Sequence, residues 1–227
     1  QIWTDVGGIM STDPKIAANA KTISSVSFAE ASELAYFGAK VLHPKTIIPA
    51  MKKNIPVKVL NSFAPKNGGT TIVSKAVKGR ETVKAIAYKN NTTMFHIEST
   101  RMLGAYGFLA RIFYLFDKYR KSVDVISTSE VSVSLTVDNS ENSDSLLKEL
   151  REFSNVSVLK DKSIICAVGE GMKNTIGVPA RIFNVLNKNR IHVEMISMGA
   201  SEINITFIVD GKDTEKAVRV LHNEYFG

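Results

Sequence analysis

The sequence predicts a mixed α/β protein in which two βαββαβ units follow a shorter α/β segment and the first unit is inserted in the second. A segment of about 70 residues occurs twice, and both copies show helical and alternating apolar spacing in the same order. The second copy ends one strand short. The composition of the 227 residues, 44% apolar and 22% charged, is that of a folded globular protein.

The composition also excludes several classes of protein. The single cysteine, Cys166, rules out a disulfide framework and a cysteine-based zinc cluster, so we expect no metal site and a reducing, cytoplasmic compartment. No stretch of about 18 residues is apolar and free of charge, which argues against a membrane-spanning helix, and no secretory signal is visible. Because Gln1 leads almost at once into a strand-like Ile-Trp-Thr, we expect the sequence to start inside a domain.

The net charge of +7 is unevenly distributed along the sequence. Residues 1–78 carry 10 Lys or Arg and 4 Asp or Glu, whereas residues 79–162 carry 12 and 11, and residues 163–227 carry 7 and 7. The basic excess therefore lies in the first third. This distribution suits the binding of a small polyanion better than nucleic-acid binding through the whole surface.

Three local patterns organise this first third. Residues 2–5 predict a short strand that ends in polar side chains, and residues 12–15, Thr-Asp-Pro-Lys, predict a turn. Ser27 and Glu30 form a capping box, which predicts a helix that begins at the next residue after Ser27. Gly38 has the backbone freedom to end that helix.

The remainder of the sequence is dominated by the internal repeat. The tetrapeptide Ala-Arg-Ile-Phe occurs at residues 110–113 and again at 180–183, and two further segments match in the same order. In each copy the apolar spacing predicts a helix, a half-buried strand and a second helix. The expected helices span 108–119, 146–153, 178–186 and 217–225, and the alternating strands span 131–137 and 203–209.

Four further strands are expected around these elements, at residues 82–88, 93–98, 156–160 and 163–168. The sequence ends directly after the second helix of copy two, which therefore lacks its last strand. We infer that residues 82–88 supply this strand, so that copy one is inserted in copy two. Because each unit is small for a single core, we expect the two units, or two chains, to pair.

Several segments of the sequence resemble aspartokinases. Residues 99–109 and 122–132 are similar to the lysine-sensing unit of that family, a ferredoxin-like ACT domain. Residues 3–6, residues 12–14 and the Phe-Gly-Ala-Lys-Val-Leu-His-Pro motif at 37–44 resemble the end of its catalytic domain, an open α/β amino-acid kinase domain. The family's N-terminal Lys-Phe-Gly-Gly-Thr motif is absent, so the resemblance covers the C-terminal half of such an enzyme.

The resemblance implies four regions. They are the end of the amino-acid kinase domain (1–78), a linker and strand of the second ACT domain (79–92), the first ACT domain (93–162) and the second ACT domain (163–227).

The resemblance also implies an activity for the intact protein. Aspartokinases transfer the γ-phosphoryl group of ATP, bound as its magnesium complex, to L-aspartate and form 4-phospho-L-aspartate for the biosynthesis of lysine, threonine and methionine. Family members are regulated by L-lysine and associate as dimers or larger assemblies through their ACT domains. No catalytic residue is expected within residues 1–227, and we expect this segment alone to be inactive.

The family pattern assigns one group of residues to ATP. Lys15 replaces the usual arginine, and so keeps the charge but loses the bidentate geometry. Lys40 lies within the Phe-Gly-Ala-Lys motif, as a point charge for phosphate. The residues expected to contact ATP are Thr4, Asp5, Met10, Lys15 and Lys40.

A second group of residues is assigned to the effector lysine. A loop that runs into a helix N-terminus offers free N–H groups to a carboxylate, and Asp124 is expected to face the amine. From spacing alone, a packed loop with a solvent-facing aspartate would be favoured. Pro179 removes one such donor in the second unit, which we expect to pair rather than bind. The residues expected to bind lysine are Met102, Ala105, Gly107, Phe108, Leu109, Asp124, Ser129 and Glu130.

Two other functions compete with this interpretation. A stand-alone regulatory ACT subunit without catalysis has no use for the motifs of residues 1–78. An RNA-binding βαββαβ module stacks bases on exposed strand aromatics, whereas the positions expected to face outward here are polar: Ser132, Ser134, Thr136, Asn204 and Thr206. The sequence leaves open whether the effector is lysine, threonine or a pair of ligands.

Overall fold

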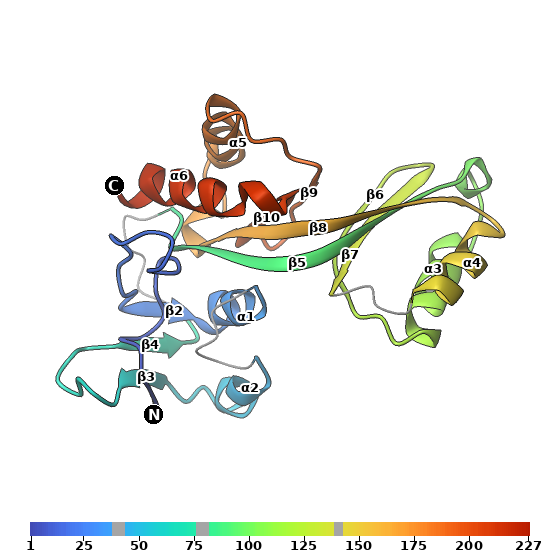
Figure 1. Ribbon diagram of the computed structural model, residues 1–227. Coiled ribbons are helices and arrows are strands. Elements are labelled where there is room, and N and C mark those ends of the chain that lie inside the picture. Colours follow the sequence, from blue (N-terminus) through green and yellow to red (C-terminus); the bar gives the residue numbers. More distant parts are fainter. Residues whose placement is uncertain (38–43, 76–81, 139–142) are drawn as a thin grey trace.

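The computed structural model describes residues 1–37, 44–75, 82–138 and 143–227 and contains two sheets (Figure 1). The N-terminal lobe, residues 1–75, has a four-stranded sheet of order β1-β3-β4-β2. Its elements are β1 (Ile2–Thr4), β2 (Ser25–Ser27), α1 (Phe28–Tyr36), α2 (Pro44–Lys52), β3 (Val57–Asn61) and β4 (Thr70–Val73).

The rest of the described chain forms a six-stranded sheet of order β6-β7-β5-β8-β10-β9. Helix pairs α3/α4 and α5/α6 lie at opposite ends of this sheet (Figure 1). The longer elements are β5 (Ala85–Glu98), α3 (Phe108–Lys118), β6 (Val123–Thr128), β7 (Ser132–Asp138), α4 (Asp144–Arg151), β8 (Asn155–Val168), α5 (Val178–Lys188), β9 (Met195–Ser197), β10 (Asn204–Asp210) and α6 (Thr214–Phe226). Short 3₁₀ turns are η1 (Thr100–Met102), η2 (Glu170–Met172) and η3 (Gly211–Asp213).

The insertion of the first unit in the second is confirmed by strand pairing. β5 pairs antiparallel with β8 along its length, from Ala85 opposite Val168 to Glu98 opposite Asn155. The early half of β5 and the late half of β8 complete the second unit beside β10, and their other halves complete the first unit beside β7. Each unit is therefore βαββαβ in the order expected from the repeat.

The expectation of four separate short strands at these places was wrong. Residues 85–88 of the first range and all of 93–98 belong to one continuous 14-residue strand from Ala85, and residues 156–160 and 163–168 belong to another. In the sequence, the polar residues between the two strands of each pair are typical of a loop. The structure accommodates them without a break, through a register shift after Lys89 and positive φ angles of 59° at Asn91 and 54° at Asp161. The domain limits expected at 92/93 and 162/163 fall inside these two strands.

Both helix pairs and the N-terminal lobe bury apolar faces of the six-stranded sheet. In the first unit, the rings of Phe95 and Phe116 meet edge to face at 5.5 Å between β5 and α3. Helices α5 and α6 form the corresponding core of the second unit. Strands β5, β8 and β10 also share a buried cluster with α1, which includes Leu34 and Ile164.

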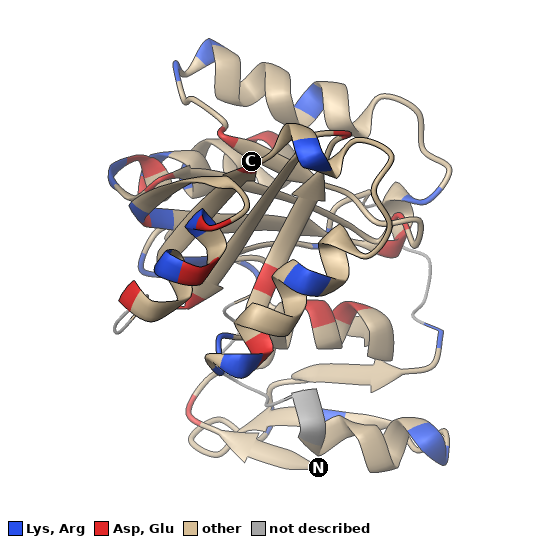
Figure 2. Cartoon of the chain, turned by 90° about the vertical axis from the view of Figure 1, so that its right-hand side faces the viewer, with Lys and Arg blue, Asp and Glu red and all other residues tan. Residues whose placement is uncertain are grey.

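The coverage by α1 changes the expectation for the polar strand positions. Thr136 and Thr206 are buried rather than facing outward, and Asn204 donates a hydrogen bond of 2.6 Å to Glu33 on α1. Basic and acidic residues are intermixed along the elements visible in Figure 2. None of the described helices is long and apolar enough to cross a membrane. A covered sheet face and mixed charge give no support to the RNA-binding alternative.

A buried carboxylate fastens α1 to the second unit. The capping box is confirmed, because Ser27 Oγ accepts from Glu30 N and Glu30 Oε2 accepts from Ser27 N at 2.8 Å. The same oxygen pairs with Lys84 Nζ at 2.9 Å, and Oε1 accepts from Glu170 N of η2 at 2.7 Å. Glu30 is fully buried, so one side chain joins three parts of the chain.

Replacing Glu30 with alanine should destabilise the protein strongly. Glu30→Ala leaves the Lys84 ammonium buried without its partner and breaks the cap, which costs about 3–5 kcal/mol. Urea unfolding should therefore show a clear fall in the free energy of unfolding. The control is Glu215→Ala. This variant removes an exposed ion pair in which Glu215 lies 3.9 Å from Arg219, and it should change the free energy of unfolding by about 0.5 kcal/mol or less. Equal losses in the two variants would contradict the role of Glu30.

Candidate functional site

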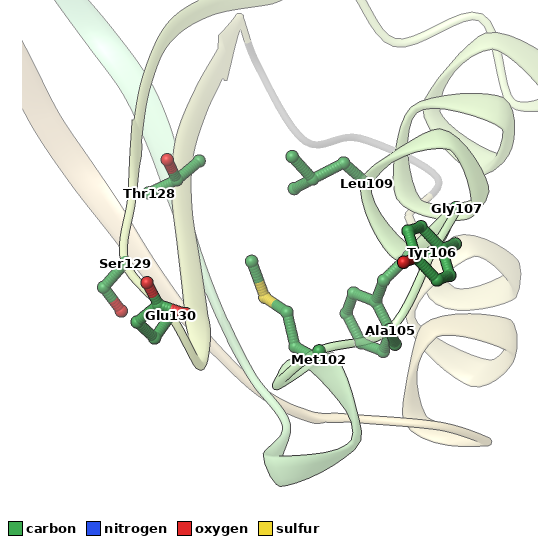
Figure 3. A pocket seen from close by; sticks show the side chains of 10 residues that line it. Met102, Ala105, Tyr106, Gly107, Leu109, Thr128, Ser129 and Glu130 are labelled. Carbon is green, nitrogen blue, oxygen red and sulfur yellow. The ribbon is translucent and has the colours of Figure 1, made fainter.

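A cavity of about 780 Å³ opens beside the N-terminus of α3 in the first unit (Figure 3). The loop after η1 and the first turn of α3 form one wall, and the end of β6 with the following turn forms the other. The lining residues are Met102, Gly104, Ala105, Tyr106, Gly107, Phe108, Leu109, Thr128, Ser129 and Glu130.

The backbone of the first wall is shaped by two glycines. Gly104 and Gly107 have positive φ angles of 65° and 77°, which residues with a Cβ adopt only with strain. Gly107 is the N-cap of α3 and supplies no side chain to the helix end. The first N–H groups of α3 therefore lack a side-chain cap, and a helix end of this kind attracts a carboxylate.

The opposite wall is a tight turn that carries an acidic group. Ser129 N donates to Ser132 O at 2.9 Å, and the two serine hydroxyls lie 2.7 Å apart. This turn holds the exposed Glu130 at the edge of the cavity. A helix N-terminus on one wall and a carboxylate on the other suit a small molecule that bears both an acid and an ammonium group.

Seven of the eight residues expected to bind lysine lie together around this cavity; Asp124 is the exception. The residues expected to bind lysine did not include Gly104 and Tyr106, although both lie inside the loop 102–109 that was expected to bind lysine. They also did not include Thr128, which directly precedes Ser129. Tyr106 is fully exposed, so its place at the cavity depends on the loop backbone rather than on burial.

At the corresponding place in the second unit, a hydrogen bond joins the acidic turn to the loop. Glu202, which the repeat matches to Glu130, accepts from Asn174 N at 2.9 Å through Oε2. Gly177 again caps the helix with a positive φ angle of 88°, but Met172 and Val178 are buried. The second unit keeps the loop geometry while its own carboxylate occupies a backbone donor of the loop.

Asp124 lies near the other end of β6 and contacts different groups. Its Oδ1 accepts from Tyr36 Oη at 2.5 Å, and its Oδ2 pairs with Lys89 Nζ at 3.0 Å. Lys89 also pairs with Asp138 at 2.6 Å. Only 1% of the Asp124 side chain is exposed. Within one chain, the structure does not bring Asp124 to the cavity.

These contacts fix the protonation of the donors. Burial, followed by the hydrogen bond to Asp124, raises the pKa of Tyr36 well above its ordinary value, so its hydroxyl stays a donor. Burial lowers the pKa of Lys89, but hydrogen bonds to Asp138 and Asp124 outweigh it and raise the pKa above the usual lysine value. Asp124 therefore has a neutral donor on one oxygen and a cation on the other.

The residues expected to contact ATP lie in the N-terminal lobe. Thr4 ends β1, where its carbonyl accepts from Ser62 N at 2.8 Å and its hydroxyl donates to the exposed Asp5 at 3.0 Å. Met10 forms an isolated bridge with Thr22. β1 and β3 are parallel, so their carboxyl ends meet near Thr4 and Asp5.

Of the two lysines in that group, the structure describes only Lys15. Lys15 is exposed on a turn in which its N–H donates to Asp13 Oδ1 at 2.9 Å. No hydrogen bond or ion pair among the described residues joins Lys15 to Thr4 or Asp5. Lys40 lies outside the described residues. No group of three or more His, Cys, Asp or Glu in the described part of the chain could hold a metal ion.

Comparison with known proteins matches two family models to this chain. Residues 1–61 match the amino acid kinase family, and residues 165–225 match the ACT domain. These segments correspond to most of the N-terminal lobe and most of the second unit. The two matched segments thus belong to different sheets of the structure.

Relatives with similar sequences match along the whole chain. Aspartokinase 3, chloroplastic, from Arabidopsis thaliana is 43% identical over 100% of this chain and 42% of its own length. Lysine-sensitive aspartokinase 3 from Escherichia coli K12 is 40% identical over 99% of this chain and 51% of its own length. The chain therefore spans about half the length of the curated relatives that it matches.

Solved structures match in the same way. E. coli aspartokinase III in complex with aspartate and ADP (R-state) gives a TM-score of 0.89 at 39% identity, over 99% of this chain and 52% of that one. The same enzyme in complex with lysine and aspartate (T-state) gives 0.85 at 40% identity, over 99% and 51%. A chain from Porphyromonas gingivalis W83, described as a C-terminal regulatory domain of aspartate kinase, gives 0.56 at 37% identity, over 63% and 97%.

Proposed function

Because the chain belongs to the aspartokinase family and matches the C-terminal half of its members, we propose that the whole protein phosphorylates L-aspartate with ATP. The product would be 4-phospho-L-aspartate, an intermediate of lysine, threonine and methionine biosynthesis. In this proposal, residues 1–227 carry part of the ATP site and a regulatory site for lysine. A location in the cytoplasm stays a prediction.

The proposal for the nucleotide rests on the N-terminal lobe. The E. coli structure that superposes on this chain was solved with ADP, and the lobe matches the amino acid kinase family. Thr4 and Asp5 follow a parallel strand, where ligands of open α/β sheets commonly bind. Lys15 and Lys40 would place positive charge on the phosphates of MgATP, and Met10 would lie near the base. These five assignments remain predictions from the sequence.

The proposal for regulation rests on the cavity of the first unit. One observation carries it: Glu130 lines a cavity in the first unit, whereas its counterpart Glu202 accepts a hydrogen bond from Asn174 N of its own loop. The carboxylate of lysine would bind at the N-terminus of α3, between Gly107 and Leu109. Its α-ammonium group would face Glu130, which among the described residues makes no bond of the Glu202 kind to its loop. Lysine would therefore reach Glu130 without displacing a hydrogen bond of the Glu202–Asn174 kind.

A chain–chain interface would account for the separation of Asp124 from the cavity. The loop that lines the cavity and helix α3 expose large apolar side chains, Leu103, Tyr106 and Tyr114, that a second copy of the chain would cover. In a homodimer, the side-chain ammonium of a lysine held in one cavity would meet Asp124 of the second copy. Lysine would then stabilise one dimer arrangement over another, as inhibition requires.

The stand-alone regulatory subunit remains the alternative. The P. gingivalis chain, described as a C-terminal regulatory domain of aspartate kinase, matches 63% of this chain. Residues 1–61 match the amino acid kinase family, and such a subunit would not need them. Aspartate-dependent turnover of ATP by the intact protein decides between the two, since a regulatory subunit alone gives none.

Glu130→Gln should weaken inhibition of the intact enzyme by lysine. The substitution keeps the shape but loses a charge-assisted contact worth about 1.5–3 kcal/mol, so half-inhibition should need about 10-fold more lysine or beyond. Glu202→Gln is the matched control in the second unit and should leave the inhibition curve nearly unchanged. An equal shift in both variants would place the effector elsewhere.

Asp124→Ala should abolish inhibition by lysine while turnover without lysine is retained. The variant removes the carboxylate for the amine but keeps the N-terminus of α3 intact. Glu194→Ala, at the matching position of the second unit, should affect the lysine affinity much less. Turnover at increasing lysine concentrations measures the inhibition, and calorimetric titration with lysine measures the affinity. A separate titration with threonine tests the other candidate effector. Full inhibition of Asp124→Ala would show that the amine binds another group.

Lys40→Ala in the intact enzyme should raise the KM for ATP more than the KM for aspartate. Loss of a lysine–phosphate contact costs about 1.5–3 kcal/mol, or roughly 10-fold or more in KM. Lys66→Ala serves as a control because Lys66 is an exposed lysine of the same lobe. An unchanged ATP dependence in Lys40→Ala would identify Lys40 as an ordinary surface residue.

A further inference from the structure

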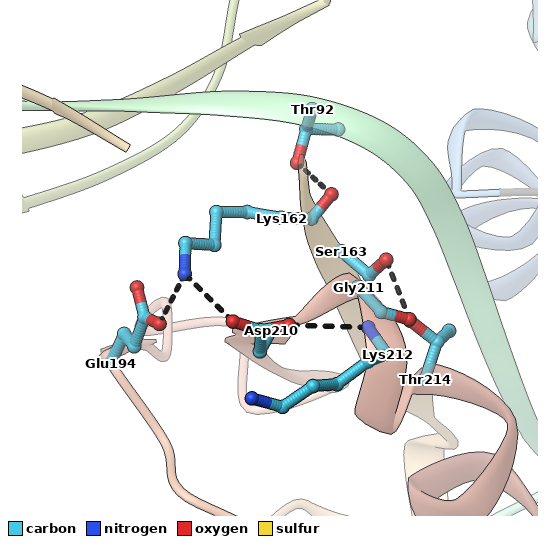
Figure 4. A network of polar contacts seen from close by, with 8 residues as sticks. All are labelled: Thr92, Lys162, Ser163, Glu194, Asp210, Gly211, Lys212 and Thr214. Carbon is cyan, nitrogen blue, oxygen red and sulfur yellow. Dashed lines mark hydrogen bonds and ion pairs between the residues drawn. The ribbon is translucent and has the colours of Figure 1, made fainter. Parts of the chain in front are cut away.

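The two units contain matching clusters in which a lysine lies between two carboxylates. In the first unit, Lys89 pairs with Asp124 and Asp138. In the second, Lys162 pairs with Glu194 at 2.7 Å and Asp210 at 3.3 Å (Figure 4). The repeat matches the carboxylates in order. Both lysines lie on the long shared strands, close to where each strand passes from one unit to the other.

The two clusters differ in their contact with the N-terminal lobe. Tyr36, the last residue of α1, donates to Asp124 Oδ1, and its ring centroid lies 5.2 Å from Lys89 Nζ. In the second cluster the corresponding oxygen, Glu194 Oε2, is buried and has no hydrogen-bond partner among the described residues. Of these two clusters, only the first joins the sheet to α1.

The contacts of Asp124 conflict with a second ligand on the same carboxylate. Each of its oxygens already accepts from one donor, and only 1% of its side chain is exposed, so its remaining lone pairs have no open approach. One occupant is the ammonium group of Lys89, which is the same chemical group as the side-chain end of free lysine. A carboxylate in this position accepts an incoming ammonium group only if its present donors give way.

We propose that Lys89 and Tyr36 act as an internal substitute for the effector, which free lysine displaces from Asp124. This inference rests on the proposed lysine site. Without lysine, the two side chains hold Asp124 and thereby clasp α1 to the first unit. With lysine bound, Asp124 turns to the ligand and the clasp opens.

The clasp contributes to the balance between two arrangements and is not its sole determinant. Lysine favours the open arrangement by its greater affinity for it, and any residue that stabilises the closed one raises the lysine concentration needed. Weakening the clasp should therefore make lysine a stronger inhibitor. A merely structural role for Tyr36 would instead weaken lysine binding or leave it unchanged.

The first test uses Tyr36→Phe in the intact enzyme. Phenylalanine keeps the ring beside Lys89 but loses one hydrogen bond, so half-inhibition should occur at about threefold to tenfold less lysine. Calorimetry should show the same gain in lysine affinity. The control is Tyr88→Phe, which removes a hydrogen bond of the same type, from Tyr88 Oη to Asp13 at 3.0 Å, between the second-unit half of β5 and the N-terminal lobe. Its lysine curve should stay within about twofold of the wild type.

The second test compares the lysines of the two clusters. Lys89→Met removes the internal ammonium group with little change in volume and should also lower the lysine concentration for half-inhibition. Lys162→Met changes the matching cluster and should leave that concentration unchanged. If Lys89→Met does not fold, Tyr36→Phe decides alone.

The outcomes separate this inference from the function on which it rests. An unchanged or weakened response of Tyr36→Phe, in an enzyme that lysine inhibits, overturns the clasp and leaves the proposed lysine site intact. An equal gain in Tyr88→Phe or Lys162→Met also overturns it, because the effect would not be specific to Asp124. A wild-type enzyme that does not respond to lysine overturns the proposed site and the clasp together.

Discussion

The antiparallel pairing of β5 with β8 is the constraint on which the regulatory part of the molecule depends. Each strand supplies half of its length to each unit, so both units are built on the same two strands. Apolar side chains on these strands enter the cores under both helix pairs and the cluster shared with α1. A shift in register would therefore disturb three cores at once, and it would separate Lys89 from Asp124.

Much of this fold follows from local patterns in the sequence. The 3.6-residue spacing located helices α3 to α6 within a few residues, and Ser27 with Glu30 predicted the start of α1. Seven cavity residues were also predictable, because they follow one another in two short motifs that meet once the unit folds. The continuity of β5 and β8 was not, since Asn91 and Asp161 favour turns when read alone. Tertiary pairing overrides that preference.

The position of Asp124 shows where sequence reasoning ends. Its partner Tyr36 lies 88 residues earlier, in another lobe, and nothing in either local sequence signals the contact. The two copies of the repeat also show that local sequence does not determine a residue's contacts. Glu130 and Glu202 occupy matching positions, yet one lines a cavity and the other bonds to its own loop. Docking of α1 and the details of one loop have given two similar units different surroundings.

The nested topology also sets an order of assembly during synthesis. The first half of β5 leaves the ribosome about 80 residues before its partner in β8, because Ala85 pairs with Val168. By then the inner unit already has all of its strands and both of its helices, so it can close first and bring the ends of β5 and β8 together. The outer unit then closes across a preformed pair of strands, at a lower entropic cost than that of a free loop. Folding of the inner unit thus acts as the scaffold for the outer one.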